Sequence, residues 1–190
     1  MTLVKIYSDT NPNKVETIDD FSSIQKALAF VNIKIERWQI RTDLAHNAES
    51  DDILEAYDQD IQRIMRNHGF SAVDVISMHG CSNLSKEDLN KARNRFLDEH
   101  KHSDDEVRFF IDGQGLFCVH EADKVIQILC KAGDFISVPA NTKHWFDMGA
   151  NPDFKCIRFF GEETGWVANY TGDNISTNFP KLNDILLPVA

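Results

Sequence analysis

The feature that most constrains the fold is a series of short β-type segments in the second half of the chain. Runs rich in β-branched and aromatic residues recur between residues 105 and 160, at 105–111, 116–120, 124–130, 135–138, 144–148 and 154–160. Turn-forming sequences such as Asp112-Gly113-Gln114-Gly115 and Asn151-Pro152-Asp153 separate these runs. This spacing is typical of a small antiparallel barrel or a double-sheet roll.

The first half of the chain has a different pattern, in which helices alternate with short strands. Hydrophobic periodicity predicts helices over 22–31, from the candidate cap Ser50 to Gly69, and after Ser85, with strands near 33–38 and 73–78. No internal repeat or linker interrupts the chain. We therefore expect one domain over 1–190. Residues 1–98 would form a layer of helices and strands, packed on a barrel core of residues 99–165.

Composition narrows the class of partner. The chain has 190 residues and a formal net charge of −10, and it contains no run of Lys or Arg. Proteins that bind nucleic acid or anionic membranes need such basic patches, so both partners are unexpected. No apolar segment approaches the roughly 18 residues of a membrane span, and no signal sequence is evident. We expect a cytoplasmic monomer with reduced, buried cysteines.

Three candidate metal ligands lie close together at the start of the β-rich half. His100, His102 and Glu106 share parity, so on a continuous strand their side chains would point to one face. Two imidazoles and a carboxylate suit a divalent cation, and His144 on a later strand is the candidate fourth ligand. An isolated His-x-His pair also occurs on solvated loops, so the prediction depends on the longer pattern.

That longer pattern matches two motifs of the cupin superfamily. The spacing His100-x-His102-x3-Glu106-x6-Gly113 reproduces the first motif from its first histidine, and Gly133-x5-Pro139-x4-His144 resembles the second. The chain departs from the common motifs at three positions. Asn94 and Asn141 replace glycines, and Met148 replaces the closing asparagine. The pattern indicates a divergent cupin.

Four such ligands leave an octahedral metal two open positions. Structural zinc sites are usually closed and four-coordinate, whereas open adjacent positions suit a bidentate oxygen substrate or a substrate with O₂. Fe²⁺ and Ni²⁺ both accept imidazole, and the ligand set does not separate them. The sequence therefore predicts one catalytic Fe²⁺ or Ni²⁺ per chain.

Several other side chains are candidates for the substrate site. Arg108 shares the parity of Glu106, so it could face the metal and stabilise a negatively charged substrate oxygen. An ion pair with a nearby acid is the alternative, and spacing favours neither; Arg158 poses the same question. Three aromatic residues could line the wall of an apolar pocket, namely Phe96, Phe146 and Trp166. Packing in the hydrophobic core is the alternative role for these side chains.

Long segments of the chain resemble the acireductone dioxygenase family. The segments are KIERWQ, FLDEHKHSDDEVRFFIDGQGLFCVH, ISVPANTKHWFDMG and CIRFFGEETGWVANYTGD, and the resemblance runs from about Lys34 to Tyr170. It implies a cupin barrel and an enzyme of methionine salvage that acts on 1,2-dihydroxy-5-(methylthio)pent-1-en-3-one and O₂. In this family the iron form yields 4-methylthio-2-oxobutanoate and formate, whereas the nickel form yields 3-methylthiopropanoate, formate and carbon monoxide.

The resemblance also implies roles for individual residues. His100, His102, Glu106 and His144 match the metal ligands of the family, and Arg108 matches the arginine assigned to the substrate oxygens. Positions near the substrate pocket are matched by Phe96, Phe146, Arg158 and Trp166.

Two other classes of function remain open. Another metal-dependent cupin dioxygenase or isomerase would share the metal site but not the long flanking segments. A non-enzymatic cupin acting as an interaction module would be expected to lack a ligand, and the sequence retains all four.

Overall fold

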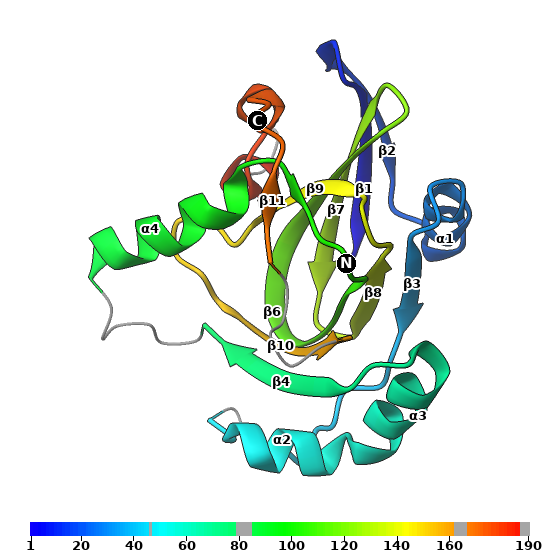
Figure 1. Cartoon of the computed structure of the whole chain (residues 1–190), viewed down its shortest axis with the longest axis vertical. Helices are drawn as coiled ribbons and strands as arrows, with labels where there is room; N and C mark the ends of the chain where they lie inside the picture. Colours follow the sequence, from blue (N-terminus) through cyan, green and yellow to red (C-terminus); the bar gives the residue numbers. More distant parts are fainter. Residues whose placement is uncertain (46, 79–84, 162–166, 187–190) are drawn as a thin grey trace.

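A computed structural model describes residues 1–45, 47–78, 85–161 and 167–186. Its elements follow the chain from an N-terminal hairpin to a short C-terminal helix (Figure 1). The strands are β1 (Leu3–Ser8), β2 (Asn11–Ile18), β3 (Lys34–Arg37), β4 (Ala72–Ser77), β5 (His100–Lys101), β6 (Glu106–Glu121), β7 (Lys124–Lys131), β8 (Asp134–Val138), β9 (Lys143–Asp147), β10 (Phe154–Phe160) and β11 (Asn169–Tyr170). The helices are α1 (Phe21–Ala29), α2 (Ser50–Ala56), α3 (Asp58–His68), α4 (Lys86–Leu97), the 3₁₀ turn η2 (Ile175–Asn178) and α5 (Leu182–Leu186).

The strands form two layers that share β6. One layer has the order β11-β5-β9-β6-β7-β1-β2, and the other has the order β4-β10-β6-β8-β3. All these pairings are antiparallel. The first half of the chain therefore contributes β1 to β4 directly to the two layers, in addition to its helices.

The long strand β6 changes layers near its middle. Residues 106–113 pair with β8 and β10, whereas residues 114–121 pair with β7 and β9. The sequence predicts two strands separated by a turn at 112–115, and this prediction is wrong. The glycines serve a bend inside one strand, because a strand must kink to pass from one sheet to the other.

Two of these glycines have no room for a side chain. Gly113 adopts a φ of 70°, and a Cβ there would lie 1.9 Å from the Asp153 carbonyl oxygen. A Cβ on Gly115 would lie 2.4 Å from the ring of Phe146. Both contacts explain why the sequence carries glycine, and so looks like a turn, at this bend.

The space between the layers is the main hydrophobic core. Its buried residues come from both halves of the chain, and include Val4, Ile35, Phe110, Phe117, Ile128, Ile136, Phe146 and Phe154. A second core lies between the outer face of β6, β8 and β10 and the helices α2 and α3, which lie beneath β4 in Figure 1. A third core lies between η2, α5 and the outer face of the layer that contains β9, β7 and β1.

The helices agree with their predicted positions except at Tyr57 and at the start of α2, where Glu49, and not the predicted Ser50, is the N-cap residue. One helix is predicted from Ser50 to Gly69, but Tyr57 separates α2 from α3 with a φ of −103° and a ψ of 10°. The periodicity continues across the break because both helices bury apolar residues in the same core. Gly69 ends α3 at a φ of 73°, and Ser85 caps α4 by accepting a hydrogen bond from the Asp88 amide, both as predicted.

Cys118, Cys130 and Cys156 are buried free thiols, as expected, and Cys81 lies outside the described residues. In the described part of the chain, no helix has the length and apolar character needed to cross a membrane.

Candidate metal centre

Four ligand-type side chains converge at one end of the space between the layers. His100 comes from β5, His102 from the segment that follows it, Glu106 from the start of β6 and His144 from β9. All four are buried, and their ligand atoms lie within 4.8 Å of one another. Because β5 pairs with β9 in the register that places His100 opposite His144, residues 44 positions apart become neighbours. The structure thus brings together the four predicted ligands.

The reason for this convergence differs from the one predicted. The parity argument assumes a continuous strand from His100 to Glu106, but β5 ends at Lys101 and β6 begins at Glu106. β5 pairs with β9 in one layer, whereas Glu106 pairs with Val138 of β8 in the other. The residues between β5 and β6 therefore cross from one layer to the other. The structure therefore brings the predicted residues together, but not along the continuous strand that the parity argument assumes.

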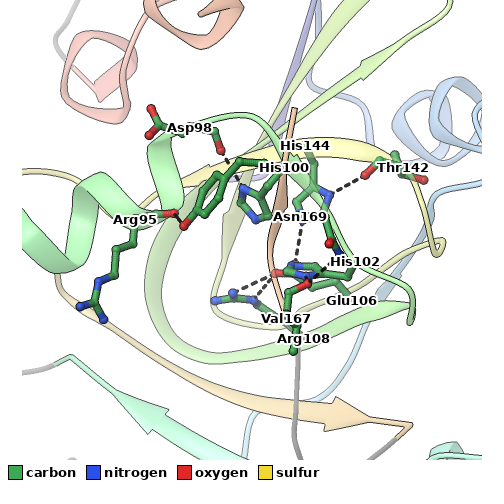
Figure 2. A network of polar contacts seen from close by, with 11 residues as sticks. Arg95, Asp98, His100, His102, Glu106, Arg108, Thr142, His144, Val167 and Asn169 are labelled. Carbon is green, nitrogen blue, oxygen red and sulfur yellow. Dashed lines mark hydrogen bonds and ion pairs between the residues drawn. The ribbon is translucent and has the colours of Figure 1, made fainter. Parts of the chain in front are cut away.

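Each imidazole is oriented by a backbone carbonyl. The Nδ1 atoms of His100, His102 and His144 lie 2.7, 3.0 and 2.8 Å from the carbonyl oxygens of Asp98, Val167 and Thr142, respectively (Figure 2). A carbonyl only accepts, so each Nδ1 carries the proton and each Nε2 presents a lone pair when the ring is neutral. This arrangement is typical of metal-binding histidines.

The two oxygens of Glu106 have different partners. Oε1 accepts hydrogen bonds from Nε of Arg108 at 2.9 Å and lies 2.8 Å from its Nη2. Oε2 lies 2.9 Å from Nε2 of His144 and 3.2 Å from Nε2 of His102. Arg108 therefore fixes the carboxylate so that one oxygen faces the imidazole lone pairs.

These distances fit a shared cation. Two ligands at right angles on a metal, each at about 2.1 Å, lie roughly 3.0 Å apart. The Nε2 to Oε2 separations are 2.9 and 3.2 Å. Three neutral imidazoles and one carboxylate also match the donors that Fe²⁺ and Ni²⁺ accept. The residues present therefore fit one such ion.

Burial and the neighbouring charges shift the pKa values of the site residues in different directions. Burial lowers the pKa of His100 to about 4. Burial by itself would raise the pKa of Glu106, but Arg108 and the two neighbouring imidazoles hold that pKa well below its usual value. Burial also opposes a charge on His102, yet the Glu106 carboxylate outweighs this effect and raises the pKa of that imidazole. The carboxylate of Glu106 and the neutral ring of His100 are therefore ready to bind a metal ion, whereas a metal ion would have to displace a proton that Glu106 favours on His102.

Arg108 lies between the ligands and an aromatic wall. Its guanidinium carbon is 4.6 Å from the ring centroid of Phe146 and 5.5 Å from that of Phe117. Phe146 is 2% exposed and belongs to the core between the layers, while Phe96 of α4 packs against the same core. Two of the three predicted aromatic residues, Phe96 and Phe146, thus border the interior that contains Arg108.

Arg158 is opposite Arg108 in the pairing of β10 with β6. Residues directly opposite each other on adjacent strands project from the same face, so both arginines face the interior. Arg158 is hydrogen-bonded through Nε and Nη2 to the two carboxylate oxygens of Asp74, with 2.8 Å between Nε and Oδ1. Arg158 therefore faces the interior and forms an ion pair with Asp74. Trp166 lies outside the described residues.

Sequence reasoning missed the groups that orient the ligands. Three of them are backbone carbonyls, of Asp98, Thr142 and Val167, and every residue has such a group, so no sequence signal marks them. Tyr170 was also missed. Its ring centroid lies 5.8 Å from that of His100, and its hydroxyl donates to the carbonyl oxygen of Arg95.

Comparison with known proteins identifies relatives along the whole chain. The model of the ARD/ARD' family matches residues 3–168. Acireductone dioxygenase of Aquifex aeolicus is 44% identical over 186 residues, covering 98% of this chain and 99% of the relative. The Methylococcus capsulatus acireductone dioxygenase is 45% identical over 186 residues, covering 98% of each chain.

A solved structure agrees in fold. Acireductone dioxygenase from Bacillus anthracis, with a cadmium ion in its active centre, superposes with a TM-score of 0.73 and is 27% identical. The match covers 90% of this chain and 98% of the other. It confirms the predicted class, a mainly β protein of cupin type with packed helices. Together with the match over residues 3–168, these relatives show that the chain belongs to the ARD/ARD' family.

Proposed function

We propose that this chain is an acireductone dioxygenase of methionine salvage. Its substrates would be O₂ and 1,2-dihydroxy-5-(methylthio)pent-1-en-3-one. With Fe²⁺ the products would be 4-methylthio-2-oxobutanoate and formate, and with Ni²⁺ they would be 3-methylthiopropanoate, formate and carbon monoxide. The observation that carries the proposal is the buried set of three oriented imidazoles and one carboxylate in a chain that matches its relatives over almost its full length.

The proposed ligands are His100, His102, Glu106 and His144. A bound divalent ion would supply Lewis acidity and a template for the two oxygens of the enediolate. An octahedral ion held by these four residues would have room for the two substrate oxygens. The carbonyl-bound Nδ1 atoms keep the imidazoles in fixed orientations, which reduces the reorganisation needed when substrate binds.

Arg108 is proposed to stabilise the negative charge of the substrate. Its guanidinium already neutralises Glu106, and it is buried at 3% exposure, where electrostatic interactions are weakly screened. Phe96 and Phe146 are proposed to line the apolar part of the pocket that receives the methylthio tail, and Arg158 and Trp166 are proposed to lie near it. Each aromatic ring would exclude water from the reacting atoms.

The test is metal replacement followed by product analysis. The apo protein is loaded separately with Fe²⁺ and with Ni²⁺, then supplied with acireductone and O₂, and the products are identified. We expect a 2-oxo acid and formate with iron, and carbon monoxide with nickel. Absence of acireductone-dependent O₂ uptake with both metals would refute the proposal and favour another cupin enzyme or a non-enzymatic cupin.

We also propose a cytoplasmic monomer that binds neither nucleic acid nor membrane.

A further inference from the structure

The turn that precedes His144 is bound to the segment that carries the other ligands. The backbone amide of Ala140 donates to Oδ1 of Asp105 at 2.8 Å, and the amide of Asn141 donates to the carbonyl oxygen of His102 at 2.7 Å. These contacts join residues 102–105 to the turn at 139–142. The two cupin motifs, which lie far apart in sequence, are thus connected outside the metal-binding atoms.

The conformation of this turn needs support. Asn141 has a φ of 63°, in the left-handed region that glycine favours. The common second motif has glycine at this position, whereas this chain has a residue with a side chain. A left-handed conformation costs about 1–2 kcal/mol for residues other than glycine, although asparagine tolerates it better than most. Hydrogen bonds donated by the backbone amides of Ala140, Asn141 and Thr142 hold the turn in that conformation.

The 139–142 turn also orients the proposed ligand His144. The carbonyl oxygen of Thr142 lies 2.8 Å from Nδ1 of His144, and this contact sets the tautomer and the plane of the ring. A continuous path therefore leads from the Asp105 carboxylate, through the turn at 139–142, to the direction of the Nε2 lone pair of His144.

We infer that Asp105 is a positioning residue, which raises metal affinity by fixing the 139–142 turn and through it His144. The inference rests on the metal site of the proposed function, but it does not depend on which substrate is used. Asp105 acts by accepting the Ala140 N–H and not as a fifth ligand, because it lies outside the group of four converging ligand atoms. Loss of orienting groups around metal ligands commonly lowers metal affinity about 10- to 100-fold.

Metal binding tests this inference without any substrate. Ni²⁺ affinity of the apo protein is measured by competition with a chromophoric chelator, for wild type and for Asp105→Ala, Asp105→Asn and Asp104→Ala. Asp104→Ala is the matched control, because it removes a carboxylate from the same segment, one that lies beside Gly161. We expect a loss of about 10- to 100-fold for Asp105→Ala. Asp105→Asn, whose amide oxygen can still accept, should restore affinity, and the control should match wild type. Thermal unfolding of each apo protein checks that folding is retained.

A double-mutant cycle separates positioning from a general effect. In a His144→Ala background, Asp105→Ala should cause no further loss of Ni²⁺ affinity, because the ligand through which it acts is absent. An equal loss in both backgrounds would overturn the inference, and so would an affinity for Asp105→Ala equal to that of wild type. Equal losses for the alanine and asparagine variants would overturn it too. Tight Ni²⁺ binding without turnover of acireductone would refute the proposed function while leaving this inference standing.

Discussion

At the scale of single residues, the partner of a side chain decides its role. Arg108 and Arg158 project from the same face of adjacent strands, yet Arg108 binds the buried Glu106 and Arg158 binds the half-exposed Asp74. The sequence predicts that Arg108 either faces the metal or forms an ion pair with an acid. The structure shows that the acid is itself a proposed ligand, so the two alternatives are not exclusive.

Replacement of His144 should weaken metal binding. His144→Ala deletes the one proposed ligand that comes from β9, so we expect bound metal to fall sharply and activity to disappear. Metal content of the purified variant, measured by elemental analysis, checks this. His68→Ala is a suitable control because that histidine is exposed at the end of α3. A His144→Ala protein with normal metal content would contradict the ligand assignment.

Replacement of Arg108 should destabilise the metal-free protein. Arg108→Ala leaves the buried Glu106 carboxylate without its cation, and breaking such a pair typically costs about 3–5 kcal/mol. Added Ni²⁺ should recover more stability in this variant than in wild type, since the ion supplies positive charge to the same carboxylate. Turnover at saturating metal should still fall at least about tenfold, which corresponds to about 1.4 kcal/mol.

Urea denaturation with and without Ni²⁺ measures the stability effect. Arg158→Ala is the matched control, because it breaks an ion pair whose side chains are 22% and 45% exposed and should cost less. Equal metal-free stability of Arg108→Ala and wild type would show that Glu106 does not depend on this arginine.

At the scale of elements, the continuous strand β6 organises the site. Its first residue is the proposed ligand Glu106, its third is Arg108, and its second half pairs with the strand that carries His144. The bend at 113–115 allows one strand to belong to both layers. Gly115 lies against the ring of Phe146, and that ring contacts Arg108. A change at the bend would therefore shift the aromatic ring beside Arg108.

A methyl group at Gly115 should therefore disturb both stability and activity. In Gly115→Ala the new Cβ would overlap the Phe146 ring, and such overpacking typically costs about 1–3 kcal/mol. We expect activity to fall at saturating metal because Phe146 must move. Gly69→Ala is the comparison, since it has open space but a left-handed φ of 73° and should lose stability alone. Denaturation and steady-state kinetics measure the two effects, and full activity in Gly115→Ala would rule out this connection.

At the scale of the whole molecule, one buried carboxylate joins three distant parts of the chain. Asp147, at the end of β9, accepts two hydrogen bonds from Arg93 of α4, at 2.7 and 2.9 Å. It also accepts from the amides of Gly149 and Leu182, the latter at the start of α5. The C-terminal helix and α4 are therefore attached to the strand that presents His144.

This network should make stability depend on pH. Burial would raise the pKa of Asp147, but Arg93 and the two amides outweigh it and leave that pKa below its usual value. A carboxyl whose pKa is lower in the folded state stabilises the protein above its unfolded pKa, and this contribution is lost as pH falls through the folded value. Asp147→Asn should thus cost about 1–3 kcal/mol at neutral pH and progressively less below about pH 4.

Urea denaturation of wild type and Asp147→Asn between pH 7 and pH 3 provides the measurement. Glu121→Gln is the control, because Glu121 is exposed at the end of β6 and should change stability little. A stability difference between wild type and Asp147→Asn that stays constant over this range would contradict the assigned network.

Features that depend on neighbouring residues could be predicted from the sequence alone. The spacing of His100, His102 and Glu106, the caps at Gly69 and Ser85, and the strand-forming runs of the second half are local patterns, and the structure contains each of them. Such patterns are readable because backbone conformation and side-chain direction repeat with a short period along the chain. The second cupin motif extended this local information to His144, 38 residues after Glu106.

Other features were decided only by tertiary structure. The sequence predicts no element before residue 22, yet β1 pairs with both β2 and β7, and it predicts a turn where β6 continues through its bend. Strand pairing depends on partners more than a hundred residues away, and a glycine pattern does not distinguish a turn from a bend. The carbonyl groups that orient the imidazoles are chemically the same at every residue. Only the folded chain determines which of them lie beside His100, His102 and His144.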